Sequence, residues 1–189
     1  MHNRPYTKVR RAEAEEETRV RIVEALMALH EEVGPSRTTV SAVAARAGVE
    51  RLTVYRHFPD EGSMIRACSA HWSGLHPLPP VPDLAGVPPH LACRRVLLPL
   101  YAWYRENHRM VTQVASDAGR VTIIADVFTE PLDDYLNKLA HALDRTWPRR
   151  SARRRTTLRH ALDHTTWRSL AHLTGNDRRA VAIVWTWVS

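Results

Sequence analysis

The segment 51–56 brings guanidinium, aliphatic and aromatic groups together on four side chains, Arg51, Leu52, Tyr55 and Arg56. Val54 and Phe58 are spaced i, i+4 and are expected to point into a core if the segment is helical. The other four side chains then form an exposed face that is both basic and apolar, and such a face on a short helix requires a partner. The major groove of B-DNA is wide enough to admit it.

Two short helices joined by a turn would position these side chains. Thr38 and Thr39 offer an N-cap for the first helix. Its apolar stripe consists of Val40, Val43, Ala44 and Ala47. Gly48 can adopt a positive φ at no steric cost in the turn, and Ala44 is small enough for two helices to cross closely. With the second helix over residues 50–58, this spacing is typical of a helix-turn-helix motif.

The segments around the motif are also predicted to be helical. Residues 1–12 carry Lys8, Arg10 and Arg11 with little apolar content, and they are expected to form a flexible basic arm. A helix follows from Glu13 and is stopped by Gly34, so the DNA-binding domain is predicted over 13–60. A connecting helix is predicted over 60–75.

Proline marks the next boundary. Six of the twelve prolines lie in the stretch HPLPPVPDLAGVPPH, so residues 76–90 are expected to be a linker. Residues 91–189 are predicted to be a helical ligand-binding and dimerisation domain. Its helical patterns cover about 90–107, 109–117, 120–146, 150–174 and 176–188, with interruptions near Pro99 and Pro131. Almost no strand alternation is present, so the predicted fold class is all-α.

Residues 18–67 resemble the N-terminal DNA-binding domain of the tetracycline-repressor (TetR) family of bacterial regulators. The positions that keep the register of the family are Thr38, Thr39, Val40, Ala44, Ala47, Gly48, Val49, Thr53, Val54, Tyr55, His57 and Phe58. Residues 165–188 are similar to the final two helices, which form the dimer interface in this family.

The resemblance implies a role for each residue of the motif. Thr39 and Ser41 would contact phosphates, while Arg51 would bind a guanine edge and Leu52 a thymine methyl group. The flanking contacts, mostly to backbone phosphate, would come from Thr53, Tyr55, Arg56 and His57. Phosphate contacts set the register, and the few base contacts specify the sequence.

The chain departs from the family pattern at four positions. His30 replaces a large apolar residue on the first helix, and Pro35 replaces an aromatic one. Glu61 and Gly62 stand where the family commonly has lysine and then glutamate. Because that lysine usually contacts phosphate, Glu61 is expected to weaken DNA binding, unless the basic arm compensates.

The resemblance implies a homodimeric, ligand-responsive transcriptional regulator in the cytoplasm, a repressor that a small-molecule effector releases from a palindromic double-stranded DNA operator. The effector itself is unknown. The candidate pocket residues are Tyr101, Trp103, Tyr104, His108, Met110, Phe128 and Tyr135. The candidate dimer residues are Leu158, Leu162, Trp167, Leu170, Val181 and Trp185.

The net charge of +7 suggests an anionic partner, but it is concentrated away from the motif. Residues 145–159, here called the arginine-rich segment, contain seven arginines and no acid. We favour the interpretation that this segment is the solvated start of a helix over the interpretation that it is a nucleic-acid-binding patch. The alternative function is a non-specific nucleic-acid or membrane-surface binder acting through the cluster Arg149 to Arg159.

Catalytic and cofactor chemistry is not expected. An enzyme in the C-terminal domain is a further alternative, but no nucleophile, phosphate-binding or metal-protease motif supports it. His160 and His164 are spaced i, i+4 without a third ligand, so structural histidines are favoured over a metal site. Cys68 and Cys93 are expected to be reduced thiols. No apolar run is long enough for a membrane span, and no secretory signal is visible.

Overall fold

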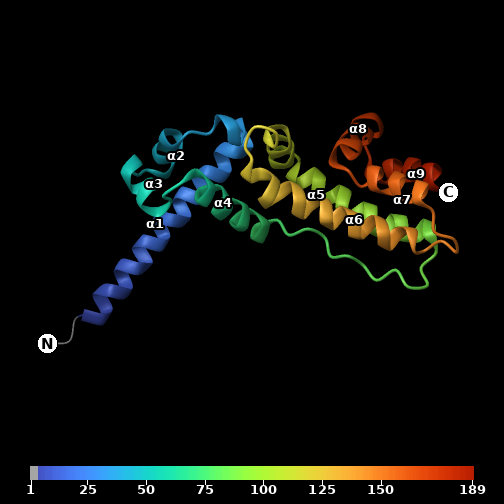
Figure 1. Cartoon of the computed structure of the whole chain (residues 1–189), viewed down its shortest axis with the longest axis horizontal. Helices are drawn as coiled ribbons and strands as arrows, with labels where there is room; N and C mark the ends of the chain where they lie inside the picture. Colours follow the sequence, from blue (N-terminus) through green and yellow to red (C-terminus); the bar gives the residue numbers. More distant parts are fainter. Residues whose placement is uncertain (1–3) are drawn as a thin grey trace. The chain divides into compact units, whose positions relative to one another are not determined.

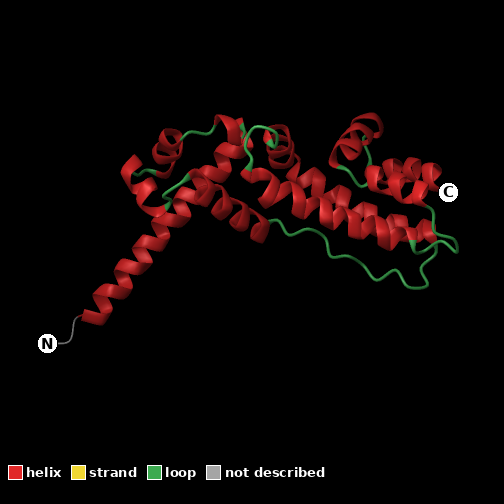
Figure 2. Cartoon of the chain, viewed as in Figure 1, coloured by secondary structure: helices red, strands yellow, loops and turns green. Residues whose placement is uncertain are grey.

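The structure is a computed structural model, which describes residues 4–189, with side chains from residue 9 onwards. All regular structure in this range is helical (Figure 2), and none of its helices is long and apolar enough to cross a bilayer. The chain divides into two compact units. The first consists of residues up to His76 together with Thr112–Phe128, and the second consists of Pro77–Val111 and Thr129–Ser189.

The residues of the first unit up to His76 form four α-helices, labelled α1 to α4 in Figure 1, and a short 3₁₀ turn. In chain order these elements are α1 (Arg4–Val33), η1 (Pro35–Arg37), α2 (Val40–Ala47), α3 (Arg51–His57) and α4 (Glu61–Leu75). Helix α1 packs against α2 and α4, and α2 packs against α3. Ile22 and Leu26 of α1, Val43 of α2 and Val54 of α3 are at most 1% exposed and form the centre of the core. Burial of this apolar surface holds the short helices together.

The start of α1 corrects one prediction. Residues 4–12 belong to the first turns of this helix and are not an irregular arm, whereas residues 1–3 lie outside the described residues. The physical reason is helix propensity, because the arginines, Lys8 and Ala12 are good helix formers, no glycine interrupts this stretch, and Pro5 lies in the first turn, where proline is tolerated.

Residues 112–128 also correct the expected division of the chain, which placed them in the C-terminal domain. The Ser69 hydroxyl of α4 donates to the carbonyl of Val127 at 3.0 Å. The Phe128 ring lies edge-on to Trp72, with 6.3 Å between ring centroids. The first unit therefore includes the end of α5 (Pro89–Asp117) and the first four residues of the π-helical turn η2 (Ala125–Thr129).

The second unit contains the rest of α5 and four further helices. These are α6 (Glu130–Asp144), α7 (Ala152–Ala161), α8 (His164–Thr174) and α9 (Asp177–Val188). Helix α6 packs against α7, and α7 and α8 both pack against α9. The hydroxyls of Tyr101 and Tyr104, both fully buried, donate to the carbonyls of Ala161 and Leu162 at 2.7 and 2.9 Å. These carbonyls lie at the end of α7, where no helical partner remains for them.

Three helix boundaries differ from the sequence prediction. Helix α5 continues through Pro99 and has no break near residue 108. The predicted helix over 150–174 is two helices, because Asp163 caps α8 by accepting a hydrogen bond from the N–H of Thr165 at 2.8 Å. The proline-rich linker contains one turn. Gly86 has a φ of 68° in this turn, which is closed by a hydrogen bond from the Val87 N–H to the Leu84 carbonyl.

Candidate nucleic-acid interface

The helix-turn-helix consists of α2, the turn 48–50 and α3. Thr39 is the N-cap of α2, and its hydroxyl accepts a hydrogen bond from the N–H of Ala42 at 3.2 Å. Gly48 has a φ of 65°, in the left-handed region that side chains with a Cβ disfavour. The N–H groups of Gly48 and Val49 bond carbonyls in the last turn of α2. This turn ends α2 and directs the chain into α3.

The inner side of α3 is fixed by burial. Val54 is 1% exposed, and Phe58, directly after the helix, is 4% exposed. Ala44 and Ala47 of α2 are buried in the same cluster, with Val49 packed against it. Small alanines allow the two helices to approach, and the valines fill the space between them. The orientation of α3 is therefore set by its apolar side.

The outer side of α3 presents the four side chains predicted from the sequence. Leu52 is 80% exposed and Tyr55 is 46% exposed. Arg51 and Arg56 are also exposed, and neither guanidinium has an ion pair among the described residues. Unpaired guanidinium groups beside exposed apolar groups match the acceptors and methyl groups of a DNA major groove.

The remaining candidate contact residues differ in accessibility. Thr39 and Ser41 are exposed at the start of α2. The Thr39 hydroxyl accepts the capping bond, so its proton can still be donated to a phosphate. Thr53 and His57 are half-buried. The Nε2 atom of His57 is buried and has no hydrogen-bond partner among the described residues, so a phosphate contact from that atom would require the side chain to rotate.

Acidic groups follow α3 directly. The Asp60 carboxylate caps α4 by accepting a hydrogen bond from the N–H of Ser63 at 2.6 Å. Glu61 is exposed in the first turn of α4. A carboxylate in this position interacts favourably with the helix dipole, which gives Glu61 a structural reason to be there. It also places a negative charge beside the end of α3.

Asp117 is a structural residue of the first unit that the sequence did not reveal. Its carboxylate accepts hydrogen bonds from the backbone N–H and the hydroxyl of Ser36, both at 2.8 Å. Burial alone would raise the pKa of Asp117, but the bonds from Ser36 and the nearby cations Arg120 and Arg37 outweigh it and lower the pKa. Asp117 thereby attaches the end of α5 to the turn between α1 and α2.

The buried polar pair behind the motif is uncharged at neutral pH. The Nδ1 atom of His30 lies 3.7 Å from the sulfur of Cys68. Burial lowers the pKa of His30 to about 4, although Asp117 opposes the shift, and burial raises the pKa of Cys68 to about 12. His30 therefore occupies its apolar position as a neutral group, and Cys68 is an unreactive thiol.

A protein-family comparison agrees with this geometry. Residues 22–68 match the family described as bacterial regulatory proteins, tetR family. This match covers α2 and α3 completely, together with the packed half of α1 and the first half of α4.

Residues 22–68 therefore form a domain of the tetR family. The match identifies the helix-turn-helix domain of the first unit as a DNA-binding domain of the type found in bacterial regulatory proteins. No curated protein matches the chain.

Solved structures extend the similarity from this tetR-family domain to nearly the whole chain. A Clostridium perfringens protein described as a candidate fatty acid metabolism regulator is 16% identical with a TM-score of 0.62, over 89% of this chain and 96% of that one. The multidrug binding protein EbrR, complexed with imidazole, is 19% identical with a TM-score of 0.56, over 92% and 90%. A TetR transcriptional regulator from Rhodococcus sp. RHA1 is 20% identical with a TM-score of 0.44, over 94% and 99%. At these identities the first two likenesses show the fold alone.

The predicted pocket residues are not gathered at one place. Tyr101, Trp103, Tyr104 and Met110 are buried, and both tyrosine hydroxyls bond the end of α7. His108 is exposed, and Phe128 belongs to the first unit. Tyr135 donates its hydroxyl to the carbonyl of Pro79 at 2.7 Å. Their role in effector binding stays a prediction.

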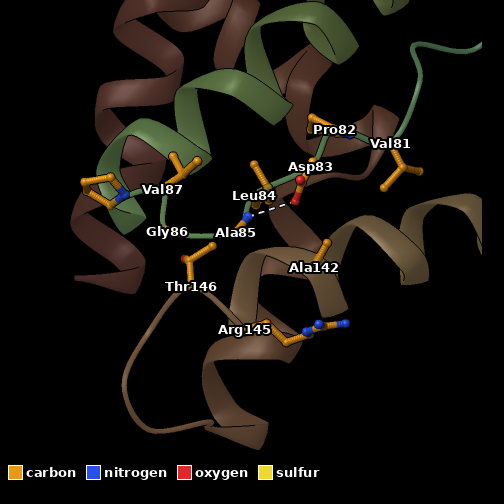
Figure 3. A pocket seen from close by; sticks show the side chains of 11 residues that line it. Val81, Pro82, Asp83, Leu84, Ala85, Gly86, Val87, Ala142, Arg145 and Thr146 are labelled. Carbon is orange, nitrogen blue, oxygen red and sulfur yellow. Dashed lines mark hydrogen bonds between the residues drawn. The ribbon is translucent and has the colours of Figure 1, made fainter.

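One pocket of the second unit lies between the linker and the end of α6, with a volume of about 550 Å³. Figure 3 shows linker residues Val81–Val87 on one side and Ala142, Arg145 and Thr146 on the other. Asp83 accepts a hydrogen bond from the N–H of Ala85 at 2.9 Å. Because Asp83 and Arg145 carry opposite charges, the lining shows no preference for one sign of ligand.

Five of the six predicted dimer residues are buried within the chain itself, and Trp185 is partly exposed. Leu158 and Leu162 are fully buried within the chain itself and offer no surface to a second copy. Trp167, Leu170 and Val181 are each less than 7% exposed. The apolar periodicity on which the predicted dimer interface rests instead marks the side of each helix that faces the core of its own chain. Sequence alone does not separate the two, because a core and an interface select the same residue types. The exposed apolar side chains of α8 and α9 are instead Leu173 at 75%, Ile183 at 37% and Trp187 at 42%.

His164 packs among aromatic rings of the second unit. The ring of His164 packs against Tyr104 and Trp167, at 5.2 and 5.5 Å between centroids. Burial lowers the pKa of His164 to about 4. Within the described residues, no three His, Cys, Asp or Glu side chains are grouped to hold a metal ion.

The arginine-rich segment is partly neutralised by contacts inside the second unit. Arg154 forms an ion pair at 3.4 Å with Asp144, whose side chain is 2% exposed, and its guanidinium lies 4.7 Å from the centroid of Trp147. Arg159 pairs with Asp133 at 2.5 Å and with Asp163 at 3.7 Å. These arginines stabilise the start and the end of α7.

Proposed function

We propose that this tetR-family regulator is a cytoplasmic, homodimeric repressor that binds a palindromic operator and is released by a small-molecule effector. The observation that carries the proposal is the outer face of α3, where Arg51, Leu52, Tyr55 and Arg56 are exposed beside a fully packed inner face. Exposed apolar side chains beside guanidinium groups without an ion pair among the described residues are available for a ligand.

The contacts divide into those that specify sequence and those that position the protein. Arg51 binds guanine through two parallel hydrogen bonds, and Leu52 packs against a thymine methyl group. Thr39, Ser41 and Arg56 contact phosphates. We further propose that Thr53, Tyr55 and His57 flank these contacts, with His57 acting after its ring has rotated.

Dimerisation follows from the exposed apolar side chains of α8 and α9. Leu173, Ile183 and Trp187 would be buried by a second copy, which removes apolar surface from water. Two reading helices then face two half-sites one helical turn of DNA apart, or a multiple of that distance. A palindromic operator is the expected consequence of the two-fold symmetry.

Effector control would work through a shift between two conformations of the dimer. A ligand that binds only the conformation with the wrong half-site spacing lowers DNA affinity by its differential affinity for the two states. The EbrR structure, titled as a multidrug binding protein complexed with imidazole, supports a ligand-binding role for this fold. Helix α4, which follows the motif directly, is the expected lever.

The experiment that tests the function is selection of genomic fragments bound by the full-length protein. A shared palindrome among the enriched fragments is the expected result, and transcription from the adjacent promoter should rise when the gene for the regulator is deleted. Enrichment without a common sequence would overturn specific binding. A fall in transcription on deletion would overturn repression and leave the DNA-binding role intact.

A further inference from the structure

A second cavity of the second unit lies between the first half of α5 and helix α9. Its volume is about 320 Å³. Leu98 from α5 and Val181 from α9 contribute apolar wall, and the ring of Trp185 stands beside them. A cavity of that volume corresponds to roughly ten water-sized groups, which is the size of a small organic ligand.

The charged residues that line this cavity are all cationic. Arg94 of α5 and Arg178 of α9 are exposed and line it, and neither has an ion pair among the described residues. The acid adjacent to Arg178 is engaged elsewhere, because Asp177 pairs with Arg105 and accepts a hydrogen bond from the indole N–H of Trp167 at 3.3 Å. Two uncompensated guanidinium groups at an apolar cavity match a carboxylate with an apolar body.

The aromatic wall is held in place by its neighbours. Trp185 is stacked on Trp147 with 6.0 Å between centroids and 20° between planes. His90 meets the Trp185 ring edge-on at 6.1 Å, and Arg154 lies over Trp147. Because these contacts already fix the ring, a ligand that packs against it loses little conformational entropy on binding.

The cavity and the proposed dimer face use different sides of α9. Trp185 lines the cavity, whereas Ile183 and Trp187 are the exposed apolar residues two positions away on either side. Residues two positions apart in an α-helix point in directions about 160° apart. A second copy seated on Ile183 and Trp187 would therefore leave the cavity open.

We infer that this cavity binds a small amphiphilic carboxylate, whose anionic group is held by Arg94 and Arg178 and whose apolar part packs against Leu98, Val181 and Trp185. The linker pocket shows no such selectivity, because its lining includes both Asp83 and Arg145. The inference goes beyond the proposed function and does not depend on DNA binding.

The test is isothermal titration of the full-length protein with octanoate, which carries one carboxylate on an eight-carbon body. Octylamine and octan-1-ol are the matched ligands with opposite charge and with no charge. Octanoate should bind at least tenfold more tightly than either. Arg94→Ala and Arg178→Ala should each weaken octanoate about tenfold, as loss of a charge-assisted contact predicts. Arg179→Ala removes a neighbouring exposed arginine that does not line the cavity and should leave binding unchanged.

A second variant tests the cavity itself without changing charge. Ala182 lines the cavity, and Ala182→Trp should abolish octanoate binding while circular dichroism shows unchanged helix content. Equal binding of octanoate and octylamine would overturn the inference, as would full binding by the Arg94→Ala, Arg178→Ala double variant. Operator binding by the same variants is measured separately, so a failure here is distinguishable from a failure of the proposed function.

Discussion

Two arginine-bearing regions of the molecule differ in what their cations do. On α3, Arg51 and Arg56 are exposed and unpaired within the described chain, beside exposed Leu52 and Tyr55. In the arginine-rich segment, Arg154 pairs with buried Asp144 and covers Trp147, and Arg159 pairs with two aspartates. The first region presents its charge outward, and the second uses part of its charge to hold helices together.

This difference shows that charge density along a sequence is a poor guide to a binding surface. The arginine-rich segment alone carries a charge of +7, equal to the net charge of the chain, although the DNA-binding domain is elsewhere. Arg154 and Arg159 are less available to an anion, because a guanidinium that already bonds a carboxylate must lose that partner first.

The largest expected effect comes from breaking the internal pair of the second region. Asp144→Ala leaves Arg154 unpaired and removes the acceptor of the Ser151 N–H, so the free energy of unfolding should fall by about 2–3 kcal/mol. Urea unfolding measures the change. The matched control is Asp134→Ala, which removes an exposed carboxylate from the same helix and should change stability by about 0.5 kcal/mol or less. Equal losses in both variants would contradict a structural role for the pair.

Removing one cation from the first region should affect DNA and not stability. Arg51→Ala should weaken operator binding by about 2 kcal/mol, roughly thirtyfold, and relax base preference at one position of each half-site. Fluorescence anisotropy at fixed salt measures the affinity. Arg168→Ala, which removes an exposed guanidinium from α8, is the control and should leave operator affinity unchanged. If both variants bind alike, α3 does not read the bases.

Reversing the charge of residue 61, beside the end of α3, should strengthen DNA binding by the first region. Glu61→Lys replaces a repulsion of phosphate by an attraction, so operator affinity should rise about threefold to tenfold and the salt dependence should steepen by about one unit. Because the Glu61 carboxylate interacts favourably with the positive end of the α4 dipole, Glu61→Lys should also lower the free energy of unfolding by about 0.5 kcal/mol. Glu61→Gln should have an operator affinity between those of the unchanged protein and Glu61→Lys. An unchanged salt slope for Glu61→Lys would place residue 61 away from the DNA.

The smallest effect is expected from the exposed part of the arginine-rich segment. Simultaneous replacement of Arg149, Arg150 and Arg153 by alanine should change operator affinity by about twofold or less, because the proposed DNA contacts lie on α2 and α3 and salt screens exposed charges that make no direct contact. The measurement is repeated with non-specific DNA. A tenfold loss on both DNAs would move the nucleic-acid contact to this segment.

The helix-turn-helix could be predicted closely because its signals are local. A threonine cap, an alanine at the crossing and a glycine in the turn each act within a few residues, and the structure has all three in the predicted places. The start of α1 and the split between α7 and α8 were predicted wrongly. Helix propensity extended the first of these helices, and the Asp163 cap separated the other two.

The sequence by itself determined an all-helical chain, a helix-turn-helix at residues 39–58 and the outward direction of Arg51 and Tyr55. Only the tertiary structure decided which apolar residues of α7 to α9 face the core, that Asp117 holds Ser36 across more than 80 residues, and that Arg94 and Arg178 share one cavity. The physical reason is separation along the chain. Periodicity defines the direction of a side chain on its own helix, whereas its partner depends on how distant helices pack.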